Sequence, residues 1–119
     1  MKRRRQKQSD AVEIFNLLLL PFAILLRTAH RYTPSEDDIR RFYTSKEWSA
    51  LSYDAMKKYG ARCCMTGATA DDGVRLVVDH IKPIRTHWHL RFEMSNLQIL
   101  SNTMNRGKGS RCSKDWRPK

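Results

Sequence analysis

The clearest pattern in this chain of 119 residues is a helical one. From Ser45 to Gly60, apolar side chains recur every three or four positions, as they do on one face of an α-helix. Ser45 is a good N-cap, and Gly60 is suited to the left-handed conformation that ends many helices. The pattern predicts a helix between these two residues whose inner face carries Trp48, Leu51, Ser52, Ala55, Met56 and Tyr59.

A different pattern follows in the C-terminal half. The run VRLVVDHI, residues 74–81, is rich in β-branched side chains and predicts a strand. NLQIL, residues 96–100, predicts a second strand, and SNTMNRGKG predicts a short helix that begins at Ser101 or Asn102. Upstream, Pro34 and Ser35 indicate the start of another helix, and Phe42 and Tyr43 are expected in the core with Trp48. These elements predict a small α+β fold.

The first 34 residues differ in composition from the remainder. MKRRRQK is a basic head, and the apolar run from Val12 to Leu26 follows it. This run is shorter than the roughly 20 apolar residues that a membrane-spanning helix needs, and it contains Asn16 and Pro21. We expect an apolar helical extension over residues 1–34 that packs on the domain or on another subunit, followed by the main domain over 35–119. A membrane-surface anchor and a signal segment are the alternatives.

Charge narrows the class of partner. Lys and Arg number 23 against 12 Asp and Glu, which gives a net charge of +11. Such an excess predicts a polyanionic partner, either nucleic acid or an anionic membrane surface. Three cysteines, two of them adjacent, favour reduced thiols and a cytoplasmic setting, with membrane association through residues 12–26 as the alternative.

The candidate chemistry lies on the predicted strand–loop–strand–helix. If His80 ends the first strand and Asn105 lies on the helix, then Asp79, His80 and Asn105 can converge. A neutral imidazole can take a proton from water, and carboxylate and amide oxygens suit Mg²⁺ or a similar ion. Arg106 and Lys108 would place positive charge beside a DNA backbone.

These residues resemble the motif of a known family. VVDHIKP, SNLQIL and MNRGKG, in this order and spacing, are similar to the ββα-metal motif of HNH endonucleases, and the likeness to small stand-alone HNH proteins of bacteria and phages extends from about Phe42 to Lys108. The resemblance implies metal-dependent phosphodiester hydrolysis that leaves 5′-phosphate and 3′-hydroxyl ends. It also implies a role for each matching residue: His80 as general base, Asn96 as the residue that holds the loop, Asp79 and Asn105 as metal ligands, and Lys82, Arg106 and Lys108 as DNA contacts.

One feature departs from that family. Relatives of this type often bind a structural Zn²⁺ through two CxxC pairs, and the matching positions here hold Cys63, Thr66, Ser101 and Met104. Hydroxyls and a thioether do not make a tight tetrahedral zinc site, so structural Zn²⁺ is predicted to be absent. A site rebuilt from Cys63, Cys64, Cys112 and a histidine is the alternative. His87 and His89 are interpreted as loop or DNA-contact residues.

Three functions are therefore carried forward. The first is a DNA endonuclease that uses Mg²⁺ or Mn²⁺ and no small-molecule cofactor, as a dimer if it breaks both strands. The second is a nucleic-acid-binding protein on a degenerate HNH scaffold with weak or no catalysis. The third is a membrane-associated protein that uses the basic head and residues 12–26.

Overall fold

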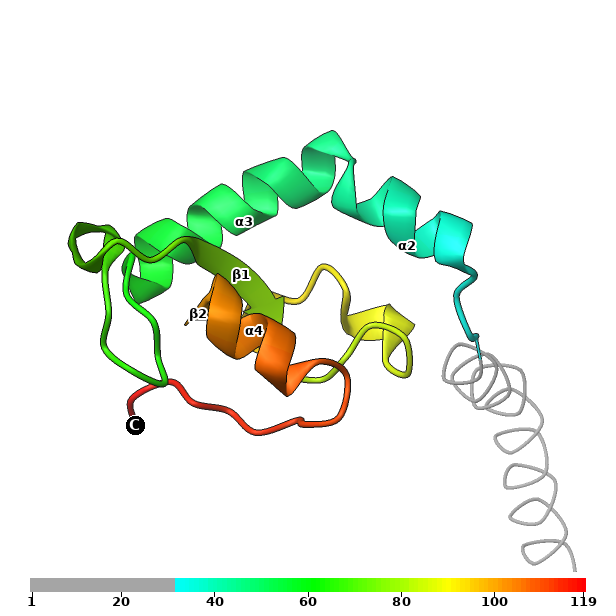
Figure 1. Ribbon diagram of the computed structural model, residues 1–119. Helices are drawn as coiled ribbons and strands as arrows, with labels where there is room; N and C mark the ends of the chain where they lie inside the picture. The colour runs from blue at the N-terminus through cyan, green and yellow to red at the C-terminus, as the bar shows by residue number, and fades with distance from the viewer. Residues whose placement is uncertain (1–31) are drawn as a thin grey trace, which may run out of the picture. The chain divides into compact units, whose positions relative to one another are not determined.

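Two consecutive helices open the part of the chain that the computed structural model describes, residues 32–119 (Figure 1). Helix α2 (Glu36–Tyr43) is capped by Ser35, whose hydroxyl accepts from the backbone N–H of Asp38 at 3.2 Å while the Asp38 carboxylate accepts from the backbone N–H of Ser35 at 2.9 Å. Helix α3 (Lys46–Tyr59) is capped by Ser45 and ends at Gly60 with φ 83°. Both predicted helix starts and the predicted end are confirmed.

The centre of the domain is a two-stranded antiparallel sheet. Strand β1 (Leu76–His80) pairs with β2 (Leu97–Ser101), with Val78 opposite Ile99 and Asp79 opposite Gln98. Helix α4 (Asn102–Lys108) follows β2 without a loop, because Ser101 both ends the strand and caps the helix through a 3.3 Å bond from the Met104 N–H. The α+β class and the ββα order expected from the sequence are confirmed.

The two faces of this sheet have different neighbours because side chains alternate along a strand. Leu97 and Ile99 are fully buried and form a core with Ala55 of α3, as the helical pattern predicted. Burying a side chain of this size stabilises a fold by about 1.5–3 kcal/mol, so α3 holds the sheet firmly from one side. Asp79 and Gln98 point to the opposite face, where a side chain of α4 contacts Asp79.

The connection between the strands contains two short 3₁₀ turns, Trp88–Leu90 and Met94–Asn96, and a third 3₁₀ turn, Ala70–Asp72, precedes β1. Asn96 therefore lies in a turn just before β2 and not in the strand. Tyr43 also differs from its expected place in the core: Phe42 is buried, but Tyr43 is 45% exposed. Helix α2 has only eight residues, so the spacing of its apolar side chains does not show which of these two neighbouring rings faces the core.

Several sequence expectations fall outside the described residues. They concern residues 1–31, which include the basic head and the apolar run 12–26. The helical character of that run and the division of the chain at residue 34 therefore stay predictions. Within residues 32–119, no helix combines the length and hydrophobicity that crossing a bilayer requires.

Candidate active site

His80 lies at the end of β1 in an apolar setting. Its residue is 3% exposed, and its ring stacks on Trp48 with centroids 5.0 Å apart and planes inclined by 23°. Burial lowers the pKa of His80, although the hydrogen bond with the Arg91 carbonyl and the charge of Asp79 oppose this effect. The imidazole is therefore neutral near pH 7, which is the form that can accept a proton.

The orientation of the His80 ring fixes which nitrogen can accept that proton. Nε2 lies 2.9 Å from the backbone oxygen of Arg91. A carbonyl oxygen can only accept, so Nε2 carries the hydrogen and Nδ1 keeps its lone pair. Nδ1 is buried and has no hydrogen-bond partner among the described residues. Because unpartnered buried polar atoms are rare in folded proteins, this nitrogen is a marked feature of the site.

Asp79 is held by two side chains on the other face of the sheet. Lys108 of α4 places its Nζ 3.0 Å from Oδ2 and 3.3 Å from Oδ1 of the carboxylate, and 2.8 Å from the backbone oxygen of His80. Gln98 donates from Nε2 to Asp79 Oδ2 at 2.9 Å. The carboxylate side chain is 10% exposed, so a nearby cation is needed to offset its burial.

A pocket of about 280 Å³ joins these groups at one end of the sheet. Partial burial and the Asp79 carboxylate raise the pKa of Tyr43 to about 12, so its phenol stays protonated at neutral pH. The pocket therefore offers a base, a carboxylate, an amide and a phenol to a single ligand. Its polar lining includes Tyr43, Asp79, His80, Arg85, Asn105 and Lys108.

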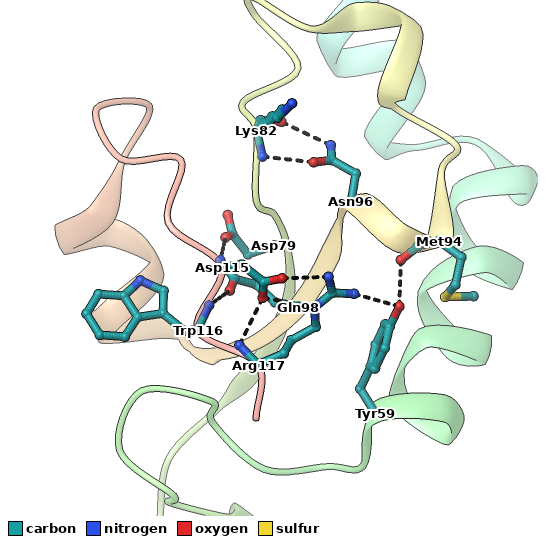
Figure 2. A network of polar contacts seen from close by, with 9 residues as sticks. All are labelled: Tyr59, Asp79, Lys82, Met94, Asn96, Gln98, Asp115, Trp116 and Arg117. Atoms are coloured by element: carbon teal, nitrogen blue, oxygen red, sulfur yellow. Dashed lines mark hydrogen bonds and ion pairs between the residues drawn. The ribbon is translucent and has the colours of Figure 1, made fainter. Parts of the chain in front are cut away.

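Asn96 fixes the chain just beyond β1. Its Oδ1 accepts from the backbone N–H of Lys82 at 2.9 Å, and its Nδ2 donates to the backbone oxygen of Lys82 at 3.1 Å (Figure 2). The backbone oxygen of Asn96 also accepts from Ile81 N–H at 2.8 Å. Asn96 is buried and contacts the loop rather than the His80 ring, which is compatible with a structural as well as a site-building role.

The three residues expected to contact DNA occupy different settings. Lys82 and Arg106 are exposed. Lys108 differs from the expectation of an exposed phosphate contact, because its side chain is 3% exposed and its ammonium contacts Asp79. The reason is helical spacing: Lys108 lies three residues after Asn105, so both side chains face the same pocket.

Sequence reasoning missed several residues of the site. Gln98 was interpreted only as part of a strand, although a polar side chain within the apolar run NLQIL is itself a signal. The C-terminal segment RCSKDWRPK, residues 111–119, indicates by its composition only a short basic tail, yet the backbone N–H of Trp116 in this segment donates to Gln98. The Arg91 carbonyl carries no signal in the sequence, since any residue supplies one.

The first two positions that match the family's zinc ligands, Cys63 and Thr66, lie in an ordered turn, whereas Ser101 ends β2 and Met104 lies in α4. Cys63 is 1% exposed, and the turn is closed by bonds from Cys63 N–H to Ala68 O and from Gly67 N–H to Cys63 O, both 2.8 Å. Within residues 32–119, no group of three or more His, Cys, Asp or Glu side chains is placed to hold a metal ion. Asp79 and Asn105 line one pocket, and the amide of Asn105 is not one of those four side-chain types.

Comparisons with known proteins add one structural relative. The chain is similar to the HNH endonuclease of the deep-sea thermophilic bacteriophage GVE2, whose crystal structure was determined with a manganese ion. The similarity covers 60% of this chain and 78% of the phage protein, with 28% sequence identity and a TM-score of 0.48. No family model and no curated protein matches the chain.

Proposed function

We propose that this protein is a DNA endonuclease that hydrolyses phosphodiester bonds with His80 as general base and with help from a divalent metal ion. The observation that carries the proposal is the buried and unpartnered lone pair of His80 Nδ1, in a residue that lines the same pocket as Asp79 and Asn105. The motif spacing in the sequence supports the same reaction class.

The base is the part of the proposal with the firmest geometric support. The Arg91 carbonyl holds the proton on Nε2, so Nδ1 would accept a proton from a water molecule that attacks phosphorus. The aromatic neighbours of the ring keep it neutral and fix its plane. In the same role, a histidine free to rotate would spend part of its time with the wrong nitrogen toward the substrate.

The donor set at Asp79 suits a hard cation. The carboxylate and the Asn105 amide supply oxygen ligands of the kind that Mg²⁺ and Mn²⁺ prefer. The site already attracts a cation, because the Lys108 ammonium contacts both carboxylate oxygens and the His80 carbonyl. A divalent ion held by Asp79 and Asn105 would stabilise negative charge on the phosphate and the leaving oxygen.

DNA is the proposed substrate because the protein is strongly basic. The net charge of +11 favours a polyanion, and two basic residues close to the proposed site residues in the sequence are exposed: Lys82, two residues after His80, and Arg106, next to Asn105. The proposed role of Lys108 is revised: it holds Asp79 and offsets its charge. A non-catalytic DNA-binding protein is the second candidate, favoured by the loss of three of the four zinc-ligand positions.

A plasmid-nicking assay separates the two candidates. Wild type is expected to cut in Mg²⁺ or Mn²⁺ and to stop in chelator. His80→Ala is expected to lose about 10²–10⁴ in rate, because a general base contributes that much, while its DNA affinity stays near that of wild type. Tyr53→Ala, which alters an exposed aromatic side chain of α3, is the control. Cutting by His80→Ala within twofold of wild type would reject the assignment.

A further inference from the structure

The C-terminal tail, residues 113–119, is attached to the sheet beside the candidate metal ligand. Figure 2 shows Gln98 between Asp79 on β1 and the backbone of Trp116 in the tail. Gln98 is fully buried, with 0% exposure, and lies directly opposite Asp79 in the strand register. A buried amide at this place has to find partners for both of its ends.

The tail determines which way the Gln98 amide faces. The backbone N–H of Trp116 donates to Gln98 Oε1 at 3.0 Å, and Gln98 Nε2 donates to Asp79 Oδ2 at 2.9 Å. A backbone N–H can only donate, so it keeps the amide oxygen toward the tail and the NH₂ group toward the carboxylate. The reversed amide would set its oxygen against the Asp79 carboxylate, which repels it.

A second attachment holds the Trp116 N–H in place. Arg117 donates from Nη1 to the Tyr59 hydroxyl at 2.9 Å, and that hydroxyl donates to the Met94 carbonyl at 2.9 Å. The Arg117 guanidinium also pairs with Asp115 at 2.7 Å. Through Arg117, one residue after the N–H that meets Gln98, the tail is joined to the end of α3 and, by way of the Tyr59 hydroxyl, to the turn before β2 (Figure 2).

We infer that the C-terminal tail is a positioning element for Asp79, and that it acts through Gln98. This inference rests on the proposed function, in which Asp79 is a metal ligand. Gln98 and the Trp116 backbone are positioning groups that touch neither substrate nor metal. Outer partners of this kind orient metal ligands, and their loss typically weakens metal affinity or activity by about 10–100-fold.

The test uses the full chain and two substitutions at one position. Trp116→Pro removes the backbone N–H, whereas Trp116→Ala keeps the N–H and removes the indole. Mn²⁺ affinity is measured by isothermal titration calorimetry, together with the Mn²⁺ concentration that gives half-maximal plasmid nicking. Trp116→Pro is expected to need about tenfold more Mn²⁺ in both measurements, with an unchanged rate at saturating Mn²⁺. Trp116→Ala should stay within about threefold of wild type.

Gln98→Met gives an independent arm, because it has a similar size and can neither accept from the tail nor donate to Asp79. It should weaken Mn²⁺ binding as much as Trp116→Pro, and the double variant should lose no more than either single one. If Trp116→Pro does not fold, Gln98→Met still tests the Gln98 link through which the tail would act, and near wild-type Mn²⁺ affinity in that variant overturns the role of the tail. The role of the tail would be overturned if the losses of Mn²⁺ affinity in the two single variants added up in the double variant. It would also be overturned if the folded variants bound Mn²⁺ as tightly as wild type.

Failure of the proposed function would look different. Asp79→Asn should weaken Mn²⁺ binding strongly in an otherwise unchanged chain. If wild type bound no Mn²⁺, or if Asp79→Asn bound it normally, Asp79 would not be a metal ligand, and the proposed function and the role of the tail would both fall. Binding that depends on Asp79 but not on Trp116 or Gln98 would reject only the role of the tail.

Discussion

At the residue scale, two neighbours in sequence occupy opposite environments. His80 is stacked on Trp48 on the α3 side of the sheet, while Asp79 contacts Lys108 and Gln98 on the other. Strand alternation produces this separation, and the end of the strand still lets both reach one pocket. The apolar side keeps the imidazole neutral, and the polar side keeps a carboxylate available to a cation.

The buried pair between Lys108 and Asp79 gives a prediction about stability. Lys108→Met keeps the length of the side chain and leaves the Asp79 carboxylate without its cation. Breaking a buried ion pair in this way typically costs about 3–5 kcal/mol, so the free energy of unfolding in urea should fall by about that amount. Mn²⁺ should restore part of the loss, because a ligand that binds only the folded state stabilises it.

Lys82→Met is the control for that experiment, because Lys82 is exposed. It should change the unfolding free energy by no more than about 0.5 kcal/mol. An equal effect of the two substitutions would show that the contact between Lys108 and Asp79 contributes nothing particular to stability.

At the scale of elements, the turn Cys63–Ala68 keeps its shape by hydrogen bonds. Besides its two closing bonds, it is joined to β2 by a bond from the Cys64 N–H to the Ile99 carbonyl at 2.8 Å. Burial alone would raise the pKa of the Cys63 thiol, but hydrogen bonds from the Thr66 side chain and from backbone groups of Ser101, Thr66 and Met65 outweigh it and bring the pKa to about 7. The turn therefore stabilises a thiolate.

This pKa predicts how stability depends on pH. The unfolded chain still holds the Cys63 proton between about pH 7 and the usual value of 9.0, whereas the folded chain has lost it. Stability should therefore rise with pH across that window. The measurement is urea unfolding at several pH values in a Cys64→Ser/Cys112→Ser variant, in which Cys63 is the one remaining cysteine. In the same variant, the ultraviolet absorbance of the Cys63 thiolate should titrate near pH 7. Adding Cys63→Ser should remove both effects; a slope that survived would come from another group.

The elements also show what the sequence could and could not predict. Helix α3, both strands and the start of α4 depend on local periodicity and caps, which a single sequence displays. The contact of Gln98 with Trp116 joins residues 18 positions apart, and the contact of Tyr59 with Arg117 joins residues 58 apart. Such pairings depend on how elements meet in space. The sequence could have predicted that Lys108 faces the pocket, because it lies three residues after Asn105 on the same helix.

At the scale of the whole molecule, the net charge of +11 governs how DNA would be held. Five of the first seven residues are Lys or Arg, and they lie outside the described part of the chain. We expect this head to add non-specific affinity, because binding to phosphates carries no sequence information.

Replacing the basic residues between Lys2 and Lys7 by Gln should weaken binding equally on all DNA sequences. The slope of log K against log salt should flatten by about 0.9 for each duplex phosphate that the head no longer neutralises. The rate of single-turnover cleavage at saturating DNA should stay unchanged. The measurement is binding and cleavage across a salt series, with Lys57→Gln/Lys58→Gln on the exposed side of α3 as the control. A lower rate at saturation would place the head at the reacting phosphate.

The direct join of β2 to α4 sets where this protein can tolerate a change of length. Ser101 ends the strand and Asn102 begins the helix, so no residue between them can absorb an insertion. One added residue would turn α4 by about 100° about its axis and carry Asn105 and Lys108 away from Asp79. An insertion beside Thr86, which is exposed in the loop between the strands, would leave the rotation of α4 about its axis unchanged. Natural or engineered diversity in length therefore belongs in the loop between the strands, whereas the number of residues at the join is fixed by geometry.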